Sequence, residues 1–234
     1  AFTQAIERAG HRVLHLTLDD TAAYLDLPAL LSALIKRYQV TQFEYQLADE
    51  YRLRQQLIEF SKVAAVEVQA FETEHFYLSD FELDEYFNQG KKHRLEHFYR
   101  KLRVRFQLLM EGNQPAGGQW NFDADNRQKL KPTDFNDVPS PLLFANDVAD
   151  ILQRLARHNI DTIGVAHAKL LWPITREQAN ELLSFFCQNC LVNFGRFQDA
   201  MTSKLDDKQA SLIEAKQWSL YHARLSFALN CKIL

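Results

Sequence analysis

Two histidines and a glutamate on one short stretch have the clearest potential for chemistry in this sequence. His93, Glu96 and His97 match the pattern H-x-x-E-H of inverted zinc peptidases. On a helix, His93 and His97 would lie one turn apart and could share a metal ion, with Glu96 beside them as general base. A solvated helix face rich in basic residues could have the same sequence. No carboxylate that could be a third metal ligand is evident on a matching helix downstream. A zinc-dependent hydrolase is therefore one open alternative.

Two cysteines have the spacing of redox and zinc-binding motifs. Cys187 and Cys190 form a C-x-x-C pair. Redox pairs sit at the N-terminus of a helix, where the helix dipole activates the thiol. This pair instead falls inside a predicted helix among apolar neighbours, and Cys231 brings the number of thiols to only three. We interpret the pair as two small residues on or near a core face.

A basic stretch between positions 91 and 105 is interleaved with the aromatic residues Phe98, Tyr99 and Phe106. Its cations are Lys91, Lys92, Arg94, Arg100, Lys101, Arg103 and Arg105. Arg100 and Arg103 are one helical turn apart, so part of this charge shares a face. Cations beside aromatic rings suit a phosphate backbone with stacked bases, although a solvated helix face has the same composition. A non-catalytic nucleic-acid-binding module is the second open alternative.

The first 71 residues alternate between helical and strand-like patterns. Helical spacing and capping signals predict three helices, and polar–apolar alternation predicts three strands between them. The order reads as an open parallel sheet with helical crossovers. The unit opens on a crossover helix with no strand before it, so we expect that N-terminal strands are missing. The elements are Ala1–Ala9, His11–Leu18, Asp26–Tyr38, Thr41–Leu47, Asp49–Val63 and Ala65–Phe71.

The remainder of the chain is predicted to be helical apart from one long loop. Ser79 and Glu82 form a capping-box signal for a helix through about Asn88. The long loop is Glu111–Pro141, with three glycines and four prolines. The other predicted helices are Lys92–Met110, Asn146–His158, Thr175–Asn193 (ending before Gly195) and one or two within Gln209–Leu234. The predicted fold class is thus α/β followed by all-α.

The composition excludes several classes of protein. With 47% hydrophobic and 24% charged residues, the chain resembles an ordinary globular protein, and no apolar run approaches the roughly 18 residues of a membrane span. The net charge of −3 does not attract nucleic acid to the protein as a whole, so any contact with nucleic acid needs a local basic patch. Three cysteines argue against a disulfide scaffold. We expect a cytoplasmic protein.

The long loop contains a specific signature. Residues 117–127 read G-G-Q-W-N-F-D-A-D-N-R, which closely resembles the G-G-x-W-N-F-D-x-[ED]-N-R signature of the bacterial deoxyribodipyrimidine photolyase-related family, an iron–sulfur branch of photolyases and cryptochromes. Further blocks resemble the same family in the same order: Phe98-Tyr99-Arg100, Leu108-Leu109-Met110, Asn193-Phe194-Gly195 and Gln198-Asp199-Ala200-Met201.

The resemblance implies a division of the chain into three parts. Residues 1–78 would be part of an α/β antenna domain, 79–142 the interdomain helices and long loop, and 143–234 the first helices of a photolyase-type FAD domain. Members of the family repair (6-4) photoproducts in DNA or act in blue-light signalling, and the sequence does not separate the two activities. The whole protein would carry FAD, a lumazine antenna and a [4Fe–4S] cluster, would bind damaged DNA, and would be monomeric. This chain, truncated at both ends, would be inactive alone.

The resemblance also implies roles for particular residues. Residues 222–226 resemble the first segment of the family's flavin site, and its expected flavin contacts are His222, Leu225 and Ser226. Ala223 replaces a residue that carries a hydroxyl in the family, which removes one hydrogen-bond donor to the FAD phosphates. None of the three cysteines corresponds to a cluster ligand, and no catalytic or metal-binding residue is assigned. The connecting segment lies near the DNA-binding face in the family, so Arg100, Lys101, Arg103 and Arg105 are expected to contact phosphates. Trp120 and Arg127 are expected to order the loop.

Overall fold

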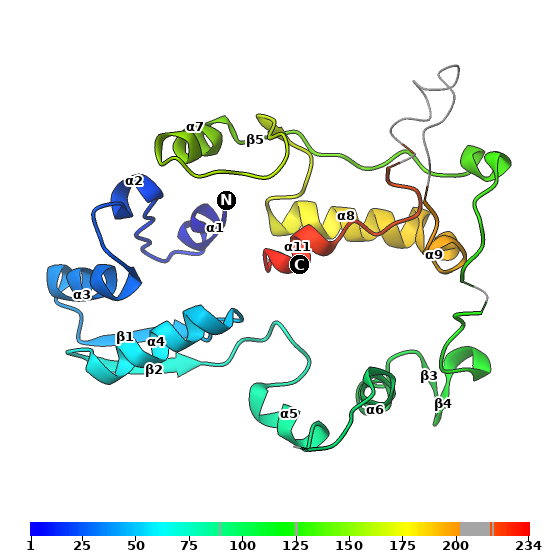
Figure 1. The fold of residues 1–234 in the computed structure, drawn as a ribbon, viewed down its shortest axis with the longest axis horizontal. Coiled ribbons are helices and arrows are strands. Elements are labelled where there is room, and N and C mark those ends of the chain that lie inside the picture. The colour runs from blue at the N-terminus through cyan, green and yellow to red at the C-terminus, as the bar shows by residue number, and fades with distance from the viewer. Residues whose placement is uncertain (89, 125, 202–215, 217) are drawn as a thin grey trace. The chain divides into compact units, whose positions relative to one another are not determined.

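The computed structural model of the chain describes residues 1–88, 90–124, 126–201, 216 and 218–234. These residues form two compact units, one comprising Leu14–Phe106 and the other comprising Ala1–Val13 with Gln107–Leu234 (Figure 1). No helix among the described residues combines the length and the apolar character that crossing a bilayer requires.

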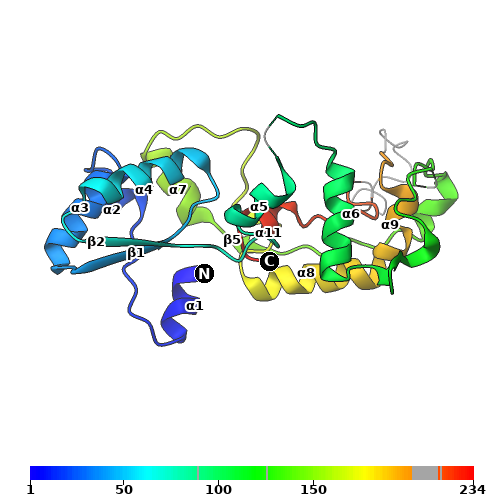
Figure 2. The same cartoon turned by 90° about the horizontal axis from the view of Figure 1, so that it is seen from below.

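A β-α-β crossover is the centre of the first unit. Strands β1 and β2 pair in parallel, from Gln42 opposite Glu67 to Gln46 opposite Phe71, and α4 connects them. Helix α4 lies against this strand pair in both views (Figures 1 and 2). Phe60 of α4 is 3% exposed and packs edge-to-face on Phe43 of β1, with ring centroids 6.0 Å apart. Burial of such a ring contributes about 1.5–3 kcal/mol. The elements are α2 (Leu18–Thr21), α3 (Leu27–Tyr38), β1 (Gln42–Gln46), α4 (Tyr51–Val63), β2 (Glu67–Phe71), α5 (Asp80–Tyr86) and α6 (Leu95–Phe106).

Helices α3 and α5 begin at the positions that the sequence predicts, and each has a capping side chain there. The Asp26 carboxylate accepts from the Ala29 N–H at 2.8 Å at the start of α3. The predicted capping box of Ser79 and Glu82 is present at the start of α5. Helix α4 is joined to α5 by an ion pair between Arg54 and Asp80. The predicted helices at Asp26–Tyr38 and Asp49–Val63, and the strands at Thr41–Leu47 and Ala65–Phe71, are therefore confirmed in substance.

The predicted strand at His11–Leu18 is wrong. Residues 11–17 have no regular structure, and α2 begins at Leu18. The Thr17 N–H and hydroxyl both donate to the Asp20 carboxylate, at 2.8 and 2.7 Å. This local capping box favours a helix start over an extended strand. The parallel sheet of the described residues consequently has two strands rather than the three that the alternation predicts.

The second unit is mainly helical, but short antiparallel pairs interrupt it. Strand β3 pairs with β4 where the predicted loop begins, and β5 pairs with β6 on either side of α7. The predicted order of an α/β part followed by a helical part agrees with this arrangement, and the short antiparallel pairs are an addition that the sequence does not predict. Its elements are α1 (Phe2–Arg8), β3 (Met110–Glu111), β4 (Gln114–Pro115), the 3₁₀ helices η1 (Ala116–Gly118) and η2 (Pro132–Asn136), β5 (Asn146–Asp147), α7 (Ala149–Arg157), β6 (Lys169–Leu170), α8 (Arg176–Asn189), α9 (Leu191–Phe197) and α11 (Ser226–Asn230).

Several predicted helix ends are shifted for local reasons. Helix α6 ends at Phe106 rather than Met110 because Gln107 and Leu109 adopt positive φ angles of 53° and 52°. The predicted helix from Asn146 begins at Ala149, since β5 pairs with β6 first. The predicted stop before Gly195 is wrong, because α9 continues to Phe197. Much of the predicted helical segment Gln209–Leu234 lies outside the described residues, and its described part contains α11.

An amide pair joins the paired strands β5 and β6 to the start of α8. The Asn146 Nδ2 donates to Gln178 Oε1 and the Gln178 Nε2 donates to Asn146 Oδ1, both at 3.0 Å. The same Gln178 oxygen accepts from the Ile174 N–H at 2.9 Å, and Asn146 also donates to the Trp172 carbonyl at 2.9 Å. At the start of α8 the Thr175 hydroxyl accepts from the Gln178 N–H at 3.2 Å, while the Gln178 side chain forms this tertiary pair.

We expect Gln178→Leu to lower the free energy of unfolding by about 1–3 kcal/mol, because the Asn146 amide and the Ile174 N–H lose a partner in partly buried positions. Denaturant unfolding of the chain measures the effect. Gln188→Leu, an exposed site on the same helix, is the matched control and should change stability by no more than about 0.5 kcal/mol. Equal losses in the two variants would show that the amide pair contributes nothing specific.

Candidate functional site

Three segments that are distant in sequence meet in one apolar core of the second unit. The long loop contributes Val138, the end of α8 with α9 contributes Phe186 and Phe197, and the segment before α11 contributes Leu220 and Tyr221. The Phe197 and Tyr221 rings stack with centroids 5.6 Å apart and planes 13° from parallel. The buried members of this core are Val138, Phe186, Cys190, Phe197, Ala200, Leu220 and Tyr221. Two of the blocks that resemble the family contribute to this core, through Phe194 and Ala200.

Polar contacts join the signature loop to helix α9 and the turn after it. The Gln128 N–H donates to the Arg196 carbonyl at 3.1 Å, and the Arg196 Nε donates to Gln128 Oε1 at 2.7 Å. Arg127 forms an exposed ion pair with Asp199 at 3.6 Å. A Cβ atom at Gly195 would lie 3.2 Å from the Asn126 side-chain oxygen, so glycine allows the loop to approach the helix closely. The prediction that Arg127 fastens the loop is consistent with this contact.

The turn at 222–226 presents its side chains in different directions. Leu225 and Ala223 are partly buried against the core, so both serve packing. His222 is half-buried, with its Nε2 3.3 Å from the Ala200 carbonyl oxygen. Ser226 is exposed at the first residue of α11, where its hydroxyl is accessible to a ligand. Of the three predicted flavin contacts, Ser226 is therefore the one whose side chain suits a phosphate donor directly.

Arg224 is a residue of this turn that the sequence analysis did not single out. It adopts a positive φ of 55° and donates from Nη1 to the Leu142 carbonyl at 3.0 Å. Its guanidinium lies 5.4 Å from the centroid of the Trp218 ring. Burial lowers the pKa of Arg224, which is opposed by the nearby Cys190. The sequence did contain a sign of this role, because Arg224 is a cation between the apolar residues Ala223 and Leu225.

The four predicted DNA contacts on α6 differ in their surroundings. Arg100 forms an ion pair with Glu96. Lys101 is exposed, with its ammonium 5.9 Å from the Tyr86 ring centroid. Arg103 is only 6% exposed and lies 5.9 Å from the Tyr99 ring centroid. Arg105 is held by a carboxylate and a hydroxyl from α5. Helix α6 therefore combines one buried guanidinium with three cations nearer the surface.

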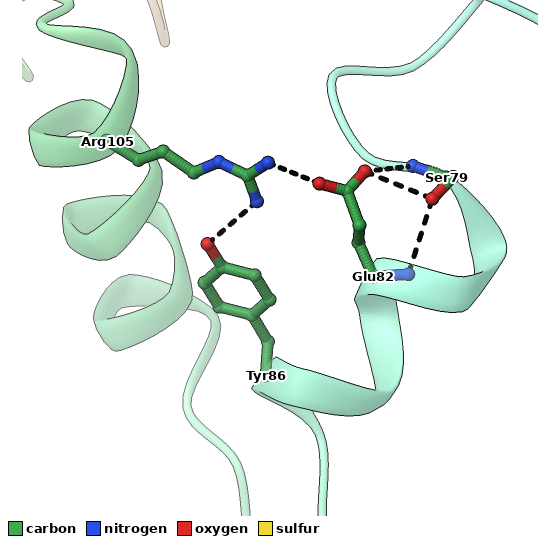
Figure 3. A network of polar contacts seen from close by, with 4 residues as sticks. All are labelled: Ser79, Glu82, Tyr86 and Arg105. Carbon is green, nitrogen blue, oxygen red and sulfur yellow. Dashed lines mark hydrogen bonds and ion pairs between the residues drawn. The ribbon is translucent and has the colours of Figure 1, made fainter.

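Glu82 is the centre of a polar network between α5 and α6 (Figure 3). One carboxylate oxygen pairs with Arg105, whose other terminal nitrogen donates to the Tyr86 hydroxyl at 3.2 Å. The other oxygen accepts from the Ser79 N–H and hydroxyl, both at 3.0 Å. The Arg105 guanidinium, followed by the Ser79 donors, lowers the pKa of Glu82 to about 2. Glu82 in turn raises the pKa of Arg105.

The H-x-x-E-H residues do not share one helix. Helix α6 begins at Leu95, so His93 precedes it, and the His93 Nε2 lies 2.8 Å from the Asn88 carbonyl oxygen. Glu96 is engaged by Arg100. Among the described residues, no three His, Cys, Asp or Glu side chains gather in a way that could hold a metal ion. This geometry provides no observation in favour of the hydrolase alternative.

The cysteines occupy contrasting positions. All three thiols are free, with Cys187 and Cys231 exposed and Cys190 buried. Burial raises the pKa of Cys190. The C-x-x-C pair spans the junction between α8 and α9, and only Cys190 belongs to the core. The interpretation as a core residue is confirmed for Cys190, whereas Cys187 faces solvent.

Comparison with known proteins gives matches along the whole chain. The family described as deoxyribodipyrimidine photo-lyase-related protein matches residues 1–171. A (6-4) photolyase of Agrobacterium fabrum is 30% identical over 239 aligned residues, covering 100% of this chain and 43% of the relative. An uncharacterized protein of Acanthamoeba polyphaga mimivirus is 34% identical over 85 residues, covering 35% of this chain and 43% of the relative. The chain thus spans less than half the length of these curated relatives.

The Glu82 network predicts a pH-dependent contribution to stability. Because folding lowers the pKa of Glu82 from 4.5 to about 2, its stabilising effect is complete above the unfolded value and is lost as the pH falls through this interval. The difference in unfolding free energy between the wild type and Glu82→Gln should therefore be largest at neutral pH and should shrink toward pH 2.

Denaturant unfolding of the chain at a series of pH values measures this difference. The matched control is the same substitution in an Arg105→Gln background, where the principal partner is absent and the difference should be smaller at neutral pH. A difference that is independent of pH in both backgrounds would contradict the assigned network.

Proposed function

The chain belongs to the deoxyribodipyrimidine photolyase-related family, and from that membership we propose that it forms part of a flavin-dependent DNA photolyase that repairs (6-4) photoproducts. The name of the Agrobacterium fabrum relative supports repair over the alternative of cryptochrome-like signalling. The single observation that carries the proposal is the 30% identity across 100% of this chain. The contacts of the signature loop with Gly195 and Asp199, which belong to two further blocks of the family, support it. Since the chain spans 43% of that relative, the activity is proposed for the whole protein.

The turn at 222–226 is the part of the described chain that we assign to FAD. Its exposed Ser226 hydroxyl can donate to a phosphate oxygen, and Arg224 holds the backbone of the turn through the Leu142 carbonyl. Leu225 secures the turn to the core. When bound and reduced, FAD would supply the photoexcited electron for repair. Ala223 cannot donate a hydrogen bond from its side chain, so this site has one fewer hydroxyl than the family pattern.

The thiols of this chain do not suit the proposed [4Fe–4S] cluster. Cys190 is buried in the apolar core, whereas Cys187 and Cys231 are exposed. We propose that the cluster ligands, like the residues around the lumazine antenna, belong to other parts of the whole protein.

Helix α6 is the proposed contact with the DNA backbone. Lys101 is exposed and carries no carboxylate partner among the described residues, which makes it the foremost phosphate contact. Arg100 and Arg105 would have to exchange Glu96 and Glu82 for phosphate oxygens. Arg103 is buried, so we assign its guanidinium to holding the helix in place rather than to the DNA surface. This narrows the four predicted contacts to three.

We expect the purified whole protein to show flavin absorbance bands and to contain iron. Ser226→Ala should weaken FAD binding about two- to tenfold through the loss of one hydrogen bond, and Ala223→Ser, which adds a hydroxyl in the same turn, should strengthen it or leave it unchanged. Absorbance spectra, metal analysis and FAD titration measure these effects. A colourless protein with stoichiometric zinc would contradict the proposal and favour the site at His93, Glu96 and His97.

We expect Lys101→Ala to reduce the dependence of DNA affinity on salt by about one unit in the log–log slope, because one phosphate contact is removed. Fluorescence anisotropy of the whole protein with ultraviolet-irradiated duplex DNA, at several salt concentrations, measures the slope. Lys36→Ala, an exposed lysine on α3 of the same unit, is the matched control. An unchanged slope in a variant lacking Arg100, Lys101 and Arg105 together would exclude α6 from the interface.

A further inference from the structure

A small hollow lies between the end of α5 and the first turns of α6, entirely within the first unit. Its volume is about 160 Å³. This is several times the roughly 30 Å³ that one molecule of liquid water occupies, so the hollow can admit a group of the size of a phosphate. Five of the lining residues are lysine, arginine or histidine and none is acidic. The lining residues are Tyr86, Phe87, Lys92, His93, Arg94, His97, Phe98 and Lys101.

Aromatic rings in mutual contact form one wall of this hollow. The Phe87 and Phe98 centroids are 4.7 Å apart, and Tyr86 packs edge-to-face on Phe98 at 5.5 Å. His93 packs edge-to-face on Phe87 at 5.3 Å, and its Nε2 lies 2.8 Å from the Asn88 carbonyl oxygen. Rings that contact one another in this way form a preformed apolar surface, on which a sugar or base can rest at low entropic cost.

The lysines and the arginine around the hollow differ from Arg100 and Arg105 in lacking carboxylate partners among the described residues. Arg100 and Arg105 have Glu96 and Glu82, respectively. Among the residues that the structure describes, Lys92, Arg94 and Lys101 form no ion pair. Three uncompensated cations around one concave surface produce a positive potential, which concentrates anions there. Their mutual repulsion would be relieved by a bound anion.

We propose that this hollow is a binding site for the phosphate group of a nucleotide. Lys92 and Arg94 hold the phosphate, Lys101 lies beside it, and the Phe87–Phe98 wall contacts the attached sugar or base. Such a group can come from a free mononucleotide or from the terminal phosphate of a nucleic-acid strand. The site requires neither flavin nor a duplex, so it is independent of the function proposed above. Only Lys101 is common to this site and the proposed contact with duplex DNA.

The test uses the 234-residue chain and isothermal titration with adenosine monophosphate, adenosine and inorganic phosphate. We expect adenosine monophosphate to bind, with adenosine at least tenfold weaker because the charged hydrogen bonds are absent. Inorganic phosphate should also be weaker, since it lacks the contact with the aromatic wall. Binding of adenosine with an affinity equal to that of adenosine monophosphate would overturn the proposal.

Variants locate the binding on the chain. Lys92→Ala with Arg94→Ala should weaken binding of adenosine monophosphate at least tenfold, whereas Lys36→Ala with Arg37→Ala, which removes the same two charges from α3, should leave it unchanged. Lys92 and Arg94 are exposed and precede α6, and circular dichroism checks that the fold is retained. Lys92→Arg keeps the charge and should retain binding. Equal loss in the two double variants would overturn the assignment.

A 5′-phosphorylated tetrathymidylate and its unphosphorylated form distinguish the two sources. Tighter binding of the phosphorylated strand than of adenosine monophosphate supports a strand end as ligand, and binding of the mononucleotide alone supports a free nucleotide. If phosphorylation makes no difference and the mononucleotide does not bind, the site does not exist. None of these outcomes depends on the duplex measurement with Lys101→Ala, so either proposal can fail alone.

Discussion

The stacking of Phe197 on Tyr221 joins the helix beside the signature loop to the segment that we assign to FAD. Each residue is 3% exposed, and each belongs to a different segment of the core. Tyr221 directly precedes the turn at 222–226, and Phe197 ends the helix against which the signature loop packs. Burial of two large rings offsets the conformational entropy of ordering loops that have little regular structure. The position of the Ser226 hydroxyl therefore depends on a contact between segments distant in sequence.

The availability of the cations on α6 depends on carboxylates, one of which lies on α6 itself and the other on α5. Glu96, one turn before Arg100, and Glu82, on α5, each neutralise one arginine. Lys101 receives no such partner among the described residues, and neither do Lys92 and Arg94. A cation that already has a carboxylate must exchange it to bind phosphate, whereas a cation without one contributes its full attraction. The pairing pattern, rather than the number of basic residues, thus decides which of them are available to an anion.

Local signals predicted the elements of the first unit well where helix caps and strand pairs agreed. Asp26 and Ser79 begin α3 and α5 as expected, and the two alternating segments around α4 pair in parallel. The segment His11–Leu18 shows the limit of this reasoning. Its alternation suits a strand, but a strand also requires a partner, and the capping box of Thr17 and Asp20 provides a local alternative. Similarly, Gly195 reads as a helix stop, yet it lies within α9, where its small size admits Asn126.

The sequence by itself determined the family, the crossover unit around α4 and the set of candidate residues. These follow from ordered motifs and from periodicity, which are local properties of the chain. Only the tertiary structure decided how each candidate is used. It buried Arg103, directed Leu225 into the core, left Ser226 exposed, and introduced Arg224 as the anchor of the turn. The physical reason is that burial and ion pairing depend on neighbours from distant segments, which no spacing along the chain encodes.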